Sequence, residues 1–92
     1  MQVILNFIEQ YPPDDKPCTH TALVNIPDAI SVTSSQIVRD ISDIKDERDS
    51  LPDDEWNSLG WDKKIDRILN ELAEQYKFEV LADTIVRKVY LN

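Results

Sequence analysis

The fold is decided by residues 62–76, which read DKKIDRILNELAEQY. Apolar residues recur there at helical spacing and make one continuous face of Ile65, Ile68, Leu69, Leu72, Ala73 and Tyr76. The opposite side is polar and holds Lys63, Arg67, Asn70, Glu71 and Glu74. Arg67 and Glu71 stand one turn apart and can pair. This stretch therefore predicts an amphipathic helix that opens at Asp62 and packs on another element.

A second helix is predicted upstream, over residues 34–51, with Ser34 or Ser35 as its N-cap. One row of this helix falls within about 40° of a single line on a helical wheel. The row consists of Ile37, Ile41, Ile44, Arg48 and Leu51. Pro52 disfavours helical geometry in the residue before it and ends the helix.

Two strands are predicted nearer the N-terminus, at residues 2–9 and 19–26. Both faces of the first strand are apolar, which predicts a central strand covered on both sides. A turn segment with three prolines separates the two strands. We therefore expect a hairpin with a long loop.

Residues 77–92 fit both a strand pattern and a helix pattern. If they continued the preceding helix in phase, their apolar residues would point away from its apolar face, so a break near Lys77 is required. We favour strands, with a turn near Asp83, because the segment is rich in β-branched residues.

The predicted architecture is a single α+β domain over residues 1–92. An N-terminal hairpin and a C-terminal strand or hairpin form a small antiparallel sheet. Two amphipathic helices cover one face of that sheet, in the order ββααβ or ββααββ.

The composition excludes several classes of function. A single glycine excludes Gly-rich phosphate loops, and one cysteine with one histidine excludes zinc sites built from four such residues. The N-terminal sequence predicts no signal peptide, and no stretch is apolar enough for a membrane span. A net charge of −8 argues against direct binding to nucleic acid or to an anionic membrane. We expect a cytoplasmic protein that is not an enzyme and has no cofactor and no metal site. The sequence carries no signal for a particular oligomeric state.

The charge is concentrated in residues 40–55, where eight carboxylates against Lys45 and Arg48 leave −6. The carboxylates are Asp40, Asp43, Asp46, Glu47, Asp49, Asp53, Asp54 and Glu55. Residues 52–58 are predicted to form a short acidic helical turn, with Gly60 as its stop. Such a concentration of negative charge attracts and orients a basic partner surface.

Four interpretations of this segment stay open. It could be a docking site of a non-catalytic inhibitor or of an assembly or regulatory factor, with Trp56 and Trp61 as partner-binding anchors. It could mimic nucleic acid and block a DNA- or RNA-binding protein, since its charge density reaches about half that of duplex DNA. It could be a solubilising face of a structural subunit. Divalent-cation binding is the weakest alternative, because the EF-hand order is missing. The two tryptophans also fit a structural role at the junction between the helices.

Cys18 and His20 are two residues apart and share one face of a strand. A Cys/His pair can activate a thiolate, but the sequence places no third residue to orient it. The simpler interpretation is a buried cysteine beside a polar strand end.

Overall fold

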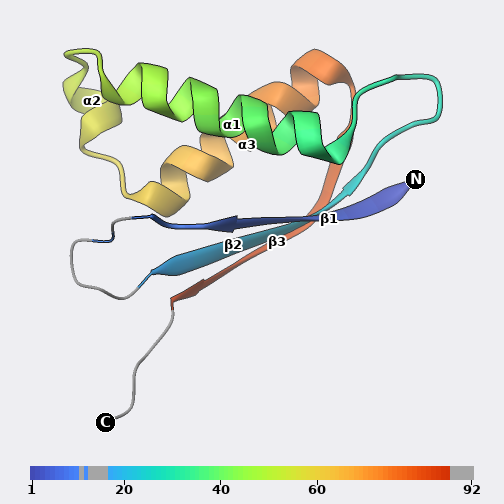
Figure 1. The fold of residues 1–92 in the computed structure, drawn as a ribbon, viewed down its shortest axis with the longest axis horizontal. Coiled ribbons are helices and arrows are strands. Elements are labelled where there is room, and N and C mark those ends of the chain that lie inside the picture. The colour runs from blue at the N-terminus through green and yellow to red at the C-terminus, as the bar shows by residue number, and fades with distance from the viewer. Residues whose placement is uncertain (11, 13–16, 88–92) are drawn as a thin grey trace, which may run out of the picture.

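The computed structural model describes residues 1–10, 12 and 17–87. Its elements are β1 (Gln2–Ile8), β2 (Cys18–Asn25), α1 (Ser34–Asp49), α2 (Asp54–Asn57), α3 (Trp61–Tyr76) and β3 (Glu79–Arg87). The strands form one layer and the helices a second layer above it (Figure 1). The structure confirms the predicted α+β class and the order ββααβ, with α2 as a short helix in the acidic connection.

The sheet is antiparallel and has the strand order β1-β2-β3, so β2 is its central strand. β1 and β2 form the predicted hairpin, in which Leu5 pairs with Ala22. On the other side of β2, Ala22 pairs with Asp83 of β3. The prediction of a central strand over residues 2–9 was wrong, because β1 lies at an edge of the sheet.

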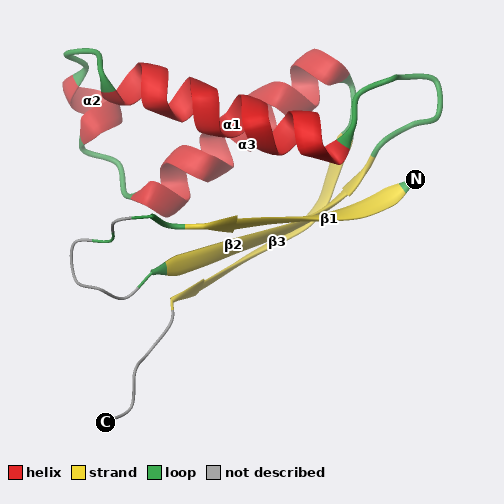
Figure 2. Cartoon of the chain, in the orientation of Figure 1, coloured by secondary structure: helices red, strands yellow, loops and turns green. Residues whose placement is uncertain are grey.

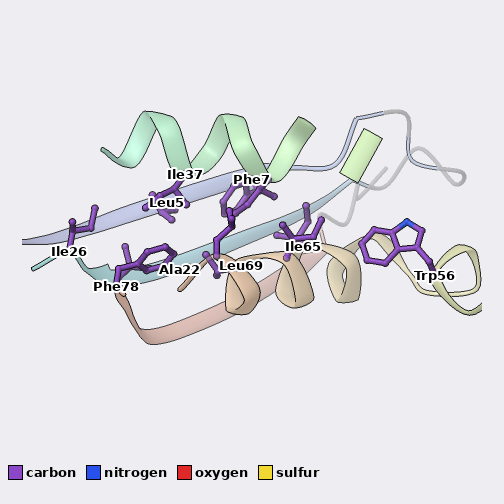
Figure 3. Close-up of a cluster of buried hydrophobic side chains, with 13 residues drawn as sticks. Leu5, Phe7, Ala22, Ile26, Ile37, Trp56, Ile65, Leu69 and Phe78 are labelled. Carbon is purple, nitrogen blue, oxygen red and sulfur yellow. The ribbon is translucent and has the colours of Figure 1, made fainter. Parts of the chain in front are cut away.

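One face of the sheet carries the helices (Figure 2). The core fills the space between the two layers (Figure 3). Its buried side chains include Leu5, Phe7, Ala22, Ile37, Ile65, Leu69 and Phe78. Burial of each large apolar side chain contributes about 1.5–3 kcal/mol, so this layer contact is the main source of stability.

The opposite face of β1 is open. Ile4 is 65% exposed and Ile8 is 66% exposed, whereas Leu5 and Phe7 on the same strand are buried. The apolar residues on both faces of β1 therefore do not indicate cover on both faces, which is the second correction to the prediction for this strand.

The helix ends follow ordinary capping chemistry, with small shifts from the predicted boundaries. Thr33, one residue before the predicted Ser34 or Ser35, is the N-cap of α1, and its Oγ1 accepts from the backbone N–H of Gln36 at 3.2 Å. Gly60, predicted to be a stop, instead occupies the N-cap position of α3.

The predicted break near Lys77 is confirmed. Lys77 ends α3 in the left-handed conformation, with φ of 68°, and its N–H donates to the carbonyl of Ala73. This conformation redirects the chain from α3 into β3.

β3 is one continuous strand, so the predicted turn near Asp83 was wrong and the strand prediction for this segment was right. Asp83 stays in the ladder opposite Ala22. The only irregularity between β2 and β3 in the described residues is a register shift between Leu23 and Val24, where Leu81 is the extra residue. Residues 88–92 lie outside the described part of the chain.

Candidate functional site

The acidic segment occupies the second half of α1, the connection that follows and the start of α2. Six of its eight carboxylates are exposed: Asp43, Asp46, Glu47, Asp53, Asp54 and Glu55. We call these six residues the acidic surface. Among them, and within the described residues, only Glu55 forms an ion pair, at 3.8 Å from Arg67. Asp53 also caps α2, because its Oδ1 accepts from the backbone N–H of Trp56 at 3.1 Å. Most of the predicted negative charge is thus available to a partner.

Asp49 belongs instead to an internal contact between α1, α2 and α3, which we call the Asp49 junction. Lys45 and Lys64 each donate to its carboxylate at 2.7 Å, and the indole Nε1 of Trp56 donates at 2.8 Å. Partial burial would raise the pKa of Asp49, but hydrogen bonds from the two ammonium groups and the indole outweigh it and lower the pKa to about 2. Asp49 therefore holds three helices together and is not available to a partner.

Trp56 is part of the core, with 3% of its surface exposed. The Arg48 guanidinium lies 5.2 Å and the Lys64 ammonium 5.5 Å from the centre of its ring, both within cation–π range. Trp61 is half-buried and packs against the same core. This placement favours the structural role for Trp56, because its ring is not accessible from the acidic surface, whereas part of Trp61 stays exposed.

Asp40 is also held internally. It accepts from the hydroxyl of Tyr76 at 2.5 Å, and this hydrogen bond raises the pKa of Tyr76 because ionisation would remove the donor. The two acidic residues held internally, Asp40 and Asp49, both link α1 to α3.

Arg67 and Glu71, which the helical spacing allows to pair with each other, instead pair with residues of other helices. Arg67 faces Glu55 of α2, and Glu71 accepts from Arg48 of α1 at 2.6 Å. These two ion pairs connect α3 to the acidic segment, since Arg48 and Glu55 both belong to residues 40–55.

A second group of titratable side chains lies between the sheet and α3, and we call it the His20 site. It combines His20 of β2, Asp66 of α3 and Asp83 of β3, whose donor atoms all lie within 4.8 Å of one another. His20 is fully buried, whereas 40% of the Asp83 side chain is exposed. The Nε2 of His20 lies 3.7 Å from an oxygen of Asp83, beyond hydrogen-bond distance.

The two carboxylates of the His20 site repel each other. Partial burial raises the pKa of Asp66, and the adjacent Asp83 raises it further, both by sharing a hydrogen bond and by its negative charge. His20 and a hydrogen bond from Asn70 act in the opposite direction. The carboxylate of Asp66 accepts from the Nδ2 of Asn70 at 3.3 Å, so the next turn of α3 fixes its orientation.

Cys18 lies on the same face of β2 as His20, and it is buried. The ring of Phe7 meets the His20 ring edge to face at a centroid distance of 6.1 Å. These placements agree with the simpler interpretation of Cys18 as a core residue.

An open groove of about 510 Å³ runs between β1, α1 and the start of α3. Its apolar lining includes Val38, Ile41 and Trp61, and Lys45 and Asp46 stand at its polar side. Because Asp46 belongs to the acidic surface, the groove and the carboxylates form one continuous region.

No helix in the described part of the chain has the length and apolar character needed to cross a membrane. Comparison with known proteins finds no matching family model, no similar curated protein and no similar solved structure.

The His20 site was not predicted, because its three members come from three elements. One signal was present in the sequence: the alternation of β2 puts His20 on the same face as Ala22 and Val24, which are core residues. A lone histidine on an apolar strand face needs a partner, and the sequence does not say which residue supplies it.

Proposed function

We propose that this protein is a non-catalytic interaction module that docks on a basic protein surface through its acidic surface. The observation that supports the proposal is that the carboxylates of the acidic segment fall into two groups, one held inside the protein and one exposed. Asp40 and Asp49 are used internally, and the other six carboxylates stay exposed with only one ion pair among them in the described residues.

The carboxylates of the acidic surface all carry the same sign of charge, so their electrostatic effect extends beyond contact distance. At physiological ionic strength the screening length is about 8 Å, so several carboxylates close together produce a potential that a cationic partner senses before contact. Such a field raises the association rate and orients the partner. It suits recognition of a surface rich in Arg and Lys.

The groove beside Asp46 adds a contact of a different kind. Its apolar lining, with half-buried Trp61 at one end, would take an apolar side chain of the partner. A basic segment that carries one such side chain matches the charge of the acidic surface and the lining of the groove together.

Charge reversal with a matched control tests the proposal. Asp43→Lys/Glu47→Lys changes the acidic surface, and Glu74→Lys/Glu79→Lys makes the same change of charge at exposed positions of α3 and β3. Both variants and the wild type are cross-linked to their partners in host lysate at low salt. The captured protein is then purified and titrated.

We expect a basic partner that binds the wild type and the Glu74/Glu79 variant and is lost with the Asp43/Glu47 variant. Its Kd should rise about tenfold or more as salt is raised from about 50 to about 300 mM. Equal binding by both variants would contradict the proposal. Competition by a nucleic acid for the same partner would identify the nucleic-acid-mimic form of this function.

A further inference from the structure

His20 is buried without the partners that a buried imidazole needs. Its exposed fraction is zero, and neither Nδ1 nor Nε2 has a hydrogen-bond partner within the described residues. An imidazole has two ring nitrogens that hydrogen-bond in water, so this burial costs free energy unless something replaces the lost contacts. Strand alternation in β2 directs the ring toward the side of the sheet that faces α3.

The surroundings of the ring supply further ligand atoms. Asp66 and Asp83 each place one carboxylate oxygen within 4.8 Å of a His20 nitrogen and of each other. Among the side chains that the structure describes, which end at residue 83, neither carboxylate has a Lys or Arg ion-pair partner, and His20 is the one basic group found beside Asp83. A positive charge at this point would relieve the repulsion between the carboxylates and give the imidazole a partner.

We propose that His20, Asp66 and Asp83 form a binding site for a divalent transition-metal ion, with Zn²⁺ as the best match. The donors are one imidazole nitrogen and two carboxylate oxygens. Zn²⁺ accepts both kinds of donor, whereas Mg²⁺ and Ca²⁺ prefer oxygen alone. Three protein ligands leave a fourth, solvent-facing position of the tetrahedron.

The geometry requires only a small movement of side chains. Ligand atoms at the usual distances of about 2.0–2.2 Å from zinc lie about 3.3 Å apart in a tetrahedron, so the three donors have to converge by about 1.5 Å at most. His20 is fixed by the core, and the exposed Asp83 has room to rotate toward it.

Two further features suit a metal site. The Nδ2 of Asn70 donates to the Asp66 carboxylate, the type of outer contact that orients a ligand. The exposed side of Asp83 provides a path for the ion from solvent. This proposal does not depend on the acidic surface, which lies on other residues.

The test is a Zn²⁺ titration of the full chain without a histidine tag, followed by calorimetry. His20 is the only histidine in the sequence, so the imidazole signals in an NMR spectrum report directly on this ring. Asp83→Asn removes one ligand charge at a partly exposed position and keeps the size of the side chain. Asp43→Asn removes the same charge from the acidic surface and is the matched control.

We expect one Zn²⁺ per chain, a shift of the His20 ring signals on binding, and a Kd that rises by about tenfold or more in Asp83→Asn. Asp43→Asn should bind Zn²⁺ as the wild type does. Ring signals that stay unchanged up to saturation would overturn the proposal. Equal weakening of Zn²⁺ binding in both variants would also overturn it, because that result would indicate a general attraction of the ion to an acidic protein.

Discussion

The Asp49 junction and the His20 site both bring a carboxylate of another element against α3: Asp49 comes from α1 and Asp83 from β3. At the junction, one carboxylate receives two ammonium groups and an indole N–H. At the His20 site, two carboxylates lie close together, and no neutralising Lys or Arg is found among the described side chains, which end at residue 83. A carboxylate that is satisfied by the protein's own cations is structural. A pair without such cations is where we expect an external one.

The largest effect is expected from Asp49→Asn, which removes the negative charge between Lys45 and Lys64. The Lys64 side chain is only 13% exposed, so its ammonium would be left without a counter-charge. We expect a loss of about 2 kcal/mol in the free energy of unfolding, measured by urea denaturation at neutral pH. Asp46→Asn, on the exposed side of α1, is the control. A loss as small as that of the control would mean that the junction contributes little.

A pH dependence of stability follows from the same residue. Its pKa is about 2 in the folded chain against 3.8 for an ordinary aspartate, so the unfolded chain binds more protons between these values. The stabilisation is fully present above about pH 4 and is lost as pH falls toward about 2. Allowing for the solvent around this side chain, we expect a decrease of about 1.5 kcal/mol that Asp49→Asn does not show. Parallel acid-unfolding curves for the two proteins would exclude this source of the pH dependence.

At the His20 site, we expect a substitution to raise the free energy of unfolding instead of lowering it. Asp83→Asn removes one of two repelling carboxylates and offers an amide to Asp66, so it should stabilise the chain by about 0.5 kcal/mol. The measurement is urea denaturation with a chelator present, which keeps metal ions away. With Zn²⁺ added in excess, the order should reverse, because the ion stabilises the folded wild type more than the variant. A variant less stable than the wild type in chelator would show that Asp83 is a structural partner of His20.

The smallest effect on stability is expected on the acidic surface. Asp43→Asn should change the free energy of unfolding by no more than about 0.5 kcal/mol, because this exposed carboxylate makes no ion pair in the described residues. The measurement is the same urea titration. A large change would place Asp43 with Asp49 among the residues that hold the fold.

The sequence predicted the helices and strands well where the apolar periodicity is strong. It predicted less well the features that depend on a strand's position in the sheet. The apolar row of α3 gave the correct helix, and the shift of phase after Tyr76 gave the correct break at Lys77. The pattern of β1 did not reveal its edge position, because Ile4 and Ile8 are apolar yet exposed. Strand order depends on pairings with distant residues, which a local pattern does not contain.

The same limit applies to the sites. The distribution of charge along the sequence identified the acidic segment. It did not show that Asp49, unlike its exposed neighbours, is held inside the protein, because that depends on hydrogen bonds from Lys64 and Trp56, which lie beyond the end of α1. The His20 site depends on Asp66 and Asp83, which only the folded chain brings to β2.

The strand order has a consequence for how the chain folds. The β1–β2 hairpin closes over residues 9–17, whereas residues 26–78, which include all three helices, separate β2 from β3. Loop-closure entropy makes the long-range pairing slower, so we expect the hairpin to form early and the third strand to dock late. Until then one side of the central strand is an unpaired edge open to other chains. Synthesis from the N-terminus prolongs that interval, because β3 is the last of the six elements to leave the ribosome.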